Sequence, residues 1–453
     1  MKTMKMTEGN PFRTIVIFAI PMIFSNLFQQ FYTVIDTLIV GNRLGKDALA
    51  AVGSAGSIIA VFVQLALGLS LGGSIVIAQF FGAGKNQKIR CCASTLVIFS
   101  AAVGLLSTLV IWVFAKKLLL LVNMPAEILE TGTRYLQIYF LGSVPIFVYN
   151  ALSGVYTALG NSKAPLKFLM ISSFVNIVLD LVFIVGFHWG VGGAAFATTI
   201  SQAVSMMLAI CDLPKILQQF PREAGKRILF EGKLLKEMLR FAFPAAIQQT
   251  VVSVGSVVVQ ATINTFGAAV IAGSTAASKV INLATTVPIS YSNAYSNYVG
   301  QNIGAGKQER IWPGLRASLL CCGGICLAMT VCLLVFCEPV LRMFISETDA
   351  DMLEVLAVGE RYIQVVGSSL TVFGVYLLVK ATFKGSGDMG WYIVTTLLSF
   401  AVRLAITVGL SDKFGVGVIW WGFTNGWIVA MVVSIVRYMQ GGWKKKAIIR
   451  EKD

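Results

Sequence analysis

Twelve long apolar stretches recur along the chain, and they restrict its fold more than any other feature. A helix needs about 20 apolar residues to cross a hydrocarbon core of about 30 Å. Strands of a membrane barrel would be about 10 residues long with alternating polarity, whereas these stretches are longer and uniformly apolar, so we predict helices. The predicted segments are 14–40, 47–78, 91–115, 128–158, 164–187, 190–214, 236–266, 270–300, 313–337, 352–383, 390–411 and 416–439. The predicted fold class is an all-α integral membrane protein.

The composition agrees with a membrane setting and argues against a nucleic-acid partner. Hydrophobic residues make up 56% of the chain and charged residues only 13%, too few for a surface that faces water on all sides. The net charge is +15, but Lys and Arg gather at the N-terminus and in the loops after the even-numbered segments. By the positive-inside rule, both termini are expected to face the cytoplasm, with the chain in the cell (plasma or inner) membrane and lipids around it.

Several short motifs occur twice, once in each half of the chain. QFFGAGK at 79–85 resembles QNIGAGK at 301–307. The further pairs are FAIP (18–21) with FAFP (241–244), NRLG (42–45) with NTFG (264–267), RYLQ (134–137) with RYIQ (361–364), and GVGGAAFAT (190–198) with GVGVIWWGFT (415–424). We interpret GAGK as a tight turn in which glycine adopts positive φ, since the spacing of a phosphate-binding loop is absent. The chain is therefore predicted to be an internal duplication.

Six predicted helices in each half give both halves the same orientation in the membrane. Parallel repeats of this kind are a transporter architecture. We predict an N-terminal six-helix lobe at 1–213, a cytoplasmic connector at 214–240, and a C-terminal six-helix lobe with a basic tail at 241–453. The two lobes are expected to surround a central cavity.

Asp36 and Asp180 are the two acids predicted to lie deep within apolar segments. An ionisable group inside a membrane is costly and indicates a functional site, although a structural polar contact between helices is the alternative. At 1.5 Å per residue, the two carboxylates are expected at similar depths near the outer side. Asn176 precedes Asp180 by one helical turn, and Thr198 is expected at a comparable depth. This oxygen-rich set is suited to hold protons or Na⁺.

The second half does not repeat this set of residues. The positions that correspond to Asp36, Asn176 and Asp180 are Val258 or Val259, Arg403 and Thr407. Arg403 is either a tethered substitute for the ion or an arginine that snorkels or pairs with a carbonyl. Lys279 and Lys380 are interpreted as snorkelling or structural residues.

Proline occupies matching places in the first helix of each half, at Pro21 and Pro244. A proline inside a helix removes a hydrogen bond and introduces a kink. Pro21 is accordingly a candidate hinge, with a static bend as the alternative.

The sequence resembles the multidrug and toxic compound extrusion (MATE) family over essentially its whole length. VIDTLIVG and NIVLD, which contain Asp36 and Asp180, resemble motifs of the DinF-like branch. The resemblance implies a cation site at Asp36, Asn176, Asp180 and Thr198, with Tyr135 of RYLQ as a weaker candidate, and a first helix that bends at Pro21. The branch that resembles NorM uses acids of the C-terminal lobe, and this sequence has no acid in the middle of its seventh or tenth predicted helix.

The resemblance implies a monomeric antiporter that exports small amphipathic organic compounds, typically cations, in exchange for H⁺ or Na⁺, without a cofactor and without enzymatic activity. Gln29, Asn150 and Gln248, together with Arg403, are the candidate cavity residues for the substrate. A flippase for a lipid-linked oligosaccharide or another lipid is the main alternative. An intramembrane enzyme that uses the two aspartates, or a channel, fits the duplicated twelve-segment frame less well.

Overall fold

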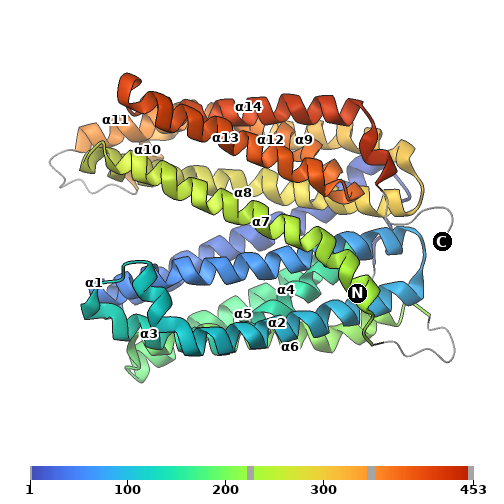
Figure 1. Ribbon diagram of the computed structural model, residues 1–453, viewed down its shortest axis with the longest axis horizontal. Helices are drawn as coiled ribbons and strands as arrows, with labels where there is room; N and C mark the ends of the chain where they lie inside the picture. The colour runs from blue at the N-terminus through green and yellow to red at the C-terminus, as the bar shows by residue number, and fades with distance from the viewer. Residues whose placement is uncertain (1–2, 222–228, 344–351, 447–453) are drawn as a thin grey trace. The chain divides into compact units, whose positions relative to one another are not determined.

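The computed structural model describes residues 3–221, 229–343 and 352–446. Within these ranges the chain is almost entirely helical and contains no strand (Figure 1). The α-helices are α1 Pro11–Gly82, α2 Asn86–Leu121, α3 Ala126–Leu141, α4 Ser143–Ala158, α5 Lys163–Asp180, α6 Gly190–Leu217, α7 Gly232–Asn264, α8 Ala268–Gly304, α9 Ile311–Val335, α10 Cys337–Arg342, α11 Met352–Tyr362, α12 Leu370–Ser386, α13 Met389–Phe414 and α14 Gly417–Met439. Four short elements complete the structure: π-helices η1 (Leu181–Gly186) and η3 (Ile363–Gly367), and 3₁₀-helices η2 (Gln308–Arg310) and η4 (Gly442–Lys445).

Every predicted apolar segment coincides with a helix or with a bent pair of helices, and the all-α prediction is confirmed. Among the described residues, nine helices are long and apolar enough to cross a membrane, or eleven if each of two bent pairs is one span. The bent pairs, α3 with α4 and α11–η3 with α12, turn by 47° and 42°. The remaining predicted segment, α8, has 37 residues but is not among these spans. It contains more serine and asparagine than the other segments, and these residues lower its hydropathy.

Some predicted boundaries differ from those in the structure. The first two predicted segments are two helical spans, Pro11–Gly45 and Asp47–Gly82, which share the label α1 and meet at a kink where Gly45 has non-helical angles (φ 82°, ψ −176°). In the predicted connector 214–240, residues 214–217 belong to the end of α6 and residues 232–240 belong to the start of α7. Residues 222–228 of the connector lie outside the described residues.

The chain divides into two compact units that do not follow the halves of the sequence at their first helices. Unit 1 is formed mainly by Phe24–Ala246, whereas unit 2 contains Met6–Ile23 and the chain from Ile247 onwards. The first turns of α1 therefore belong to unit 2, and the first turns of α7 belong to unit 1. Both crossings lie two residues after a proline, Pro21 or Pro244.

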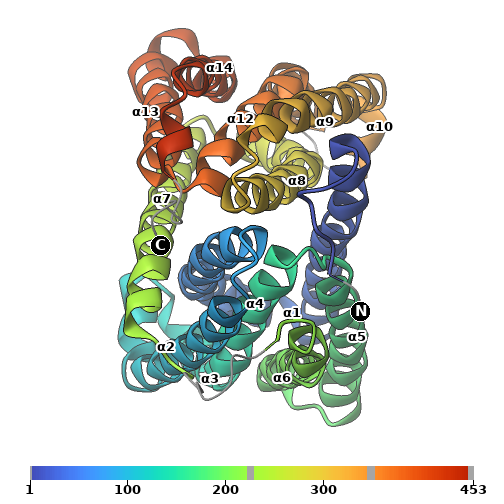
Figure 2. The ribbon, with the colours of Figure 1, turned by 90° about the vertical axis from the view of Figure 1, so that its right-hand side faces the viewer.

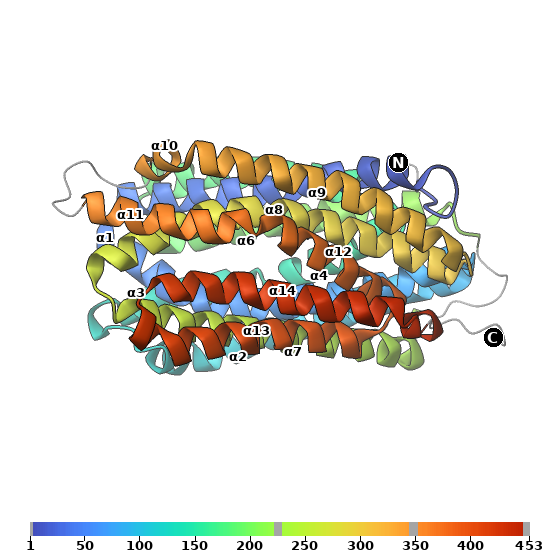
Figure 3. The same ribbon diagram turned by 90° about the horizontal axis from the view of Figure 1, so that it is seen from above.

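Within unit 1, α5 packs on α6, and α2 packs on α3 and α4. Figure 2 views these helices nearly along their axes. Within unit 2, α12 contacts α8, α9 and α14, and α13 lies beside α14 (Figure 3). Each unit has an apolar core of its own, centred on residues such as Ala51, Leu136 and Ala195 in unit 1 and Ala277, Ile363 and Trp420 in unit 2.

The repeated motifs adopt matching backbone conformations. Gly84 and Gly306, the second glycines of the two GAGK motifs, have φ values of 69° and 71°. The following lysines donate their backbone N–H to Phe80 (3.0 Å) and Asn302 (2.9 Å), the hydrogen bond that closes a Schellman cap at a helix C-terminus. The interpretation of GAGK as a glycine-dependent turn is confirmed.

The second GAGK motif also anchors the start of the chain within unit 2. Gln301 Oε1 accepts a hydrogen bond from the backbone N–H of Met6 (2.8 Å), and Lys307 Nζ donates to the carbonyl of Thr7 (3.1 Å). Arg310 Nη2 donates to the carbonyl of Gly9 (2.8 Å). These contacts hold the segment before α1 in unit 2.

Glycines allow the closest helix–helix contacts in unit 2. A Cβ added at Gly426 of α14 would lie 2.5 Å from the carbonyl oxygen of Ser399 in α13. Small residues at such crossings let helix backbones approach, as is typical of membrane helices. No heavy atom of the described residues would lie within 4 Å of a Cβ at Gly324 in α9.

We predict that Gly426→Ala lowers the melting temperature of the purified protein in detergent. The added methyl group overlaps the α13 backbone, and overpacking of this kind costs about 1–3 kcal/mol. Gly324→Ala is the matched control and is expected to be neutral or slightly stabilising, since alanine is the better helix former. Equal melting temperatures for both variants would contradict the close α13–α14 contact.

Candidate functional site

Asp36 of α1 and Asp180 of α5 lie next to each other in unit 1, although 144 positions separate them in the sequence. Asp180 is fully buried and ends α5, while Asp36 is partly buried and lies nine residues before Gly45. The structure thus brings together the two acids that the sequence predicts to lie at similar depths. Two carboxyl groups side by side away from water repel each other when both are ionised.

Three of the four carboxyl oxygens of these acids are buried and receive no hydrogen bond from any other described residue. Across the described part of the chain, no donor reaches Asp36 Oδ1 or either carboxyl oxygen of Asp180. Asn176 lies one turn before Asp180 and is also fully buried. Its Oδ1 and Nδ2 likewise have no hydrogen-bond partner among the described residues. Buried polar atoms are almost always satisfied, so this cluster is suited to receive a proton or a small cation.

Three tyrosines surround the carboxylates. Tyr135 of α3 is within electrostatic range of both acids, as is Tyr32 of α1, and Tyr139 of α3 is within range of Asp36. The rings of Tyr135 and Tyr139 lie 6.1 Å apart. Sequence reasoning did not single out Tyr32 or Tyr139. The available signal was helical spacing, because each lies four residues from a residue that had been selected, Asp36 or Tyr135.

Thr198 is buried in α6, which packs on α5, and its hydroxyl donates to the carbonyl of Ala194 (3.1 Å). The oxygen of that hydroxyl keeps lone pairs for a further contact.

Directly after Asp180 the chain changes from α-helix to the π-helix η1, whereas the corresponding helix of unit 2, α13, is α-helical throughout. π-helical segments are frequent at functional sites.

The corresponding positions in unit 2 form a different arrangement. The guanidinium group of Arg403 lies 3.3 Å from the ring centroid of Phe423 and 5.4 Å from that of Phe400. Thr407 is fully buried, and its hydroxyl has no hydrogen-bond partner among the described residues. Val259 belongs to the apolar core of unit 2. Arg403 therefore stacks on aromatic rings, whereas Asn176, which occupies the corresponding position in unit 1, lies beside carboxyl groups.

The candidate substrate residues differ in their surroundings. Gln29 is exposed on α1, and Asn150 Nδ2 donates to the carbonyl of Ile146 within α4 (2.8 Å). Gln248 of α7 is buried, and no group of the described chain donates to its Oε1. Pro21 lies inside α1. The non-helical backbone angles within α1 occur at Gly45 and not at this proline.

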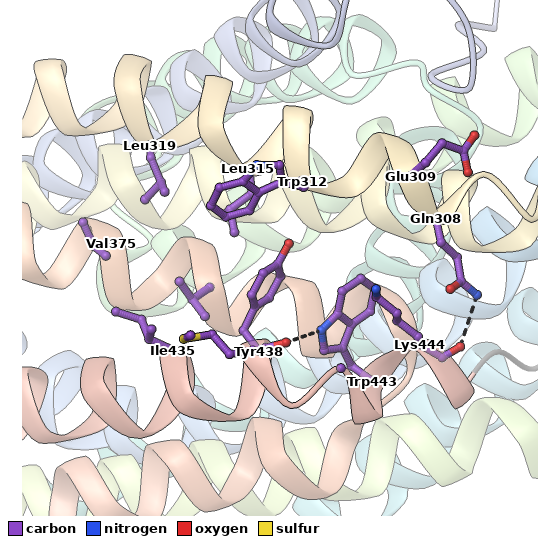
Figure 4. A pocket seen from close by; sticks show the side chains of 13 residues that line it. Gln308, Glu309, Trp312, Leu315, Leu319, Val375, Ile435, Tyr438, Trp443 and Lys444 are labelled. Carbon is purple, nitrogen blue, oxygen red and sulfur yellow. Dashed lines mark hydrogen bonds between the residues drawn. The ribbon is translucent and has the colours of Figure 1, made fainter.

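A separate pocket of about 530 Å³ lies in unit 2 between α9, α12, α14 and η4 (Figure 4). Aromatic and aliphatic side chains such as Trp312, Leu315 and Tyr438 line it. Trp443 Nε1 donates to the carbonyl of Tyr438 (3.0 Å) at its edge. None of the predicted site residues lines this pocket, so it is distinct from the acidic cluster.

Comparison with known proteins places the chain beside transporters. The family model MatE matches residues 21–182 and 244–408. The sequence is 27% identical over 453 residues to the probable multidrug resistance protein YpnP of Bacillus subtilis, covering 100% of both chains. It is 23% identical over 438 residues to the probable multidrug resistance protein NorM of Thermotoga maritima, covering 95% of this chain and 93% of that protein.

A solved structure shares the fold. The outward-facing conformation of a multidrug resistance MATE family transporter of the MOP superfamily matches with a TM-score of 0.89 at 22% identity. The match covers 98% of this chain and 100% of that chain. At this identity the likeness concerns the arrangement of helices.

We predict that Asp180→Asn does not lower the melting temperature in detergent. No described residue other than Asp36 can share a hydrogen bond with this carboxyl group, and the change relieves like-charge repulsion between the two acids. The matched control is Asp388→Asn. Asp388 is equally buried but accepts a 2.8 Å ion-pair hydrogen bond from Arg437, and breaking a buried pair costs about 3–5 kcal/mol. An equal loss of stability in both variants would contradict the unpaired state of Asp180.

Proposed function

Because the chain belongs to the MatE family of efflux transporters, we propose that it is a secondary antiporter that exports amphipathic organic cations in exchange for H⁺ or Na⁺. MATE proteins are transporters rather than enzymes, and the relatives above carry the name of multidrug resistance proteins.

The neighbouring carboxyl groups of Asp36 and Asp180 carry this proposal. Their unpartnered oxygens and Oδ1 of Asn176 are hard ligands, which suit a proton or Na⁺. Two adjacent carboxylates that share one proton or one monovalent cation avoid the repulsion of two adjacent negative charges. A stable structural contact would instead satisfy these atoms with donors from the protein.

Ion binding can drive export only if it favours one conformation over the other. We propose that an ion from the outer side neutralises the carboxyl pair and changes how α1 packs against α3 and α5. In this state the transporter binds a cationic substrate less well, so the substrate leaves outward and the ion later leaves inward. Tyr32 and Tyr135, which lie around the acids, are positioned to sense this change.

The course of α1 supports Pro21 as the bending point. The helix passes from unit 2 to unit 1 between Ile23 and Phe24, and Pro21 removes a backbone hydrogen bond just before that crossing. We further propose that the duplicated halves, 1–213 and 241–453, act as the two lobes of alternating access, with both termini in the cytoplasm.

A lipid flippase is the second candidate function. The observation that favours it is a buried pair of lysines in unit 2, Lys380 and Lys384, since ammonium groups bind the phosphates of lipid headgroups as point charges. In a flippase the acidic cluster of unit 1 would have no evident task.

We predict that proteoliposomes containing the wild type export a fluorescent organic cation under an imposed pH gradient or Na⁺ gradient, and that Asp36→Asn reduces this export to the rate of empty liposomes. The variant removes one carboxylate from the shared site, so the ion no longer discriminates between conformations. The gradient that drives wild-type export identifies the ion.

Asp47→Asn is the matched control, because Asp47 is an exposed acid of α1 that lies just after Gly45, and it is expected to retain wild-type transport. If neither gradient drives export by the wild type, the antiporter proposal is wrong and lipid flipping becomes the activity to measure.

We also predict that export of a singly charged cation is insensitive to membrane potential. One monovalent ion held between Asp36 and Asp180 then exchanges for one monovalent substrate, and no net charge moves. The potential supplies about 2.3 kcal/mol per charge per 100 mV, so a potassium–valinomycin potential should leave the initial rate unchanged. A rate that rises with an inside-negative or inside-positive potential would instead indicate two ions per cycle or none.

A further inference from the structure

Two lysines are buried together inside unit 2. Lys380 and Lys384 lie one turn apart on the same face of α12, with exposed fractions of 6% and 9%, and their ammonium groups are within electrostatic range of each other. Lysine is almost never this buried without an anionic partner. The interpretation of Lys380 as a snorkelling residue does not describe this environment, because its side chain lies inside the protein.

Among the described residues, neither lysine forms an ion pair. Asp388, the acid that follows Lys384 most closely in sequence, is paired with Arg437 at 2.8 Å. Lys384 Nζ donates a hydrogen bond to Asn293 Oδ1 of α8 (2.9 Å), and its other two donors have no acceptor in the part of the chain that the structure describes. Lys380 Nζ lies over two aromatic rings, 4.2 Å from the ring centroid of Tyr392 and 5.5 Å from that of Tyr376, and forms no hydrogen bond with any described residue.

A purely structural role explains only one of these lysines. Lys384 is in the last turn of α12, where a cation is stabilised by the helix dipole. Lys380 lies one turn earlier, and the dipole effect falls off within the last turn. Cation–π contacts are worth about 0.5–2 kcal/mol, less than the several kcal/mol that burying an ion costs.

The surroundings of Lys380 include a buried amide group whose oxygen also lacks a partner among the described residues. Tyr392 of α13, whose ring faces Lys380, interacts with the side chain of Gln248. Gln248 is 8% exposed, and no donor among the described residues reaches its Oε1. Gln248 was selected as a substrate residue from the sequence, and the structure connects it through Tyr392 to the lysine pair.

We propose that Lys380 and Lys384 bind an anionic group, a carboxylate or phosphate, of an amphiphilic substrate. An anion there accepts charge-assisted hydrogen bonds from the free ammonium donors and offsets the repulsion between the two lysines. This assignment deepens the proposed export function. It rests on that function because the bound anion is a substrate only if the protein exports it. It adds zwitterionic and acidic amphiphiles to the cations that the antiporter carries.

The test uses two dyes that differ only at a carboxylate, rhodamine B and its ethyl ester. Their binding to purified protein in detergent is measured by fluorescence anisotropy, without any ion gradient. The wild type is expected to bind the acid more tightly than the ester. Lys380→Met/Lys384→Met should weaken binding of the acid by about tenfold or more, as expected for loss of charged hydrogen bonds, and leave binding of the ester unchanged.

Two variants serve as controls. Lys380→Arg keeps the charge and should retain the preference for the acid. Lys413→Met removes an exposed lysine at the end of α13 and should behave as the wild type. Gel filtration and thermal melting show whether the double variant is folded, which is expected because methionine fills a similar volume without a buried charge.

Adding phosphatidic acid distinguishes the two sources of the anion. Displacement of lysine-dependent rhodamine B binding by this lipid assigns the site to a lipid headgroup, and no displacement assigns it to a soluble acid. Equal affinity for acid and ester in the wild type, or a double variant that binds the acid unchanged, overturns the proposal. Because binding needs no gradient, failure of the antiporter proposal leaves this result interpretable.

Discussion

The structure depends on one constraint, which is that hydrocarbon offers no hydrogen-bond partners to the backbone. Each spanning segment must satisfy its own N–H and C=O groups, and this makes the chain helical. Departures from the α-helix are therefore informative. They occur at Gly45, at the two bent pairs and at the π-helices η1 and η3, and η1 begins directly after Asp180. The acidic cluster thus lies where regular helix geometry ends.

The two units, which derive from a duplication, bury charges of opposite sign. Unit 1 contains two adjacent acids without a cation partner among its described residues, and unit 2 contains two adjacent lysines whose nearest acid in sequence is paired elsewhere. Each arrangement is costly in free energy when no ligand is bound. The same costs make each site selective, since only a ligand of the complementary charge relieves them. Duplication therefore supplied two equivalent frames, and substitution gave them different chemistry.

The sequence was sufficient for the helices, the repeat and the two aspartates, because apolar length and rare intramembrane acids are local signals. The glycine turns at Gly84 and Gly306 were predictable for the same reason. Tyr32, Tyr139 and Lys384 were not singled out, since tyrosine is ordinary at membrane interfaces and a lysine near a helix end is normally solvated. Which face of α12 turns inward depends on α8 and α13, contacts that no local pattern of α12 encodes.

The assignment of Met6–Ile23 to unit 2 and of residues up to Ala246 to unit 1 has a consequence for how the protein is made. Synthesis proceeds from the N-terminus, so the beginning of α1 emerges long before the helices that it packs with in unit 2. Unit 1 in turn is incomplete until the first turns of α7 have been translated. Unit 1 is therefore complete once the chain reaches Ala246. The first residues of α1, in contrast, cannot pack against their neighbours in unit 2 until the second half of the chain has been made.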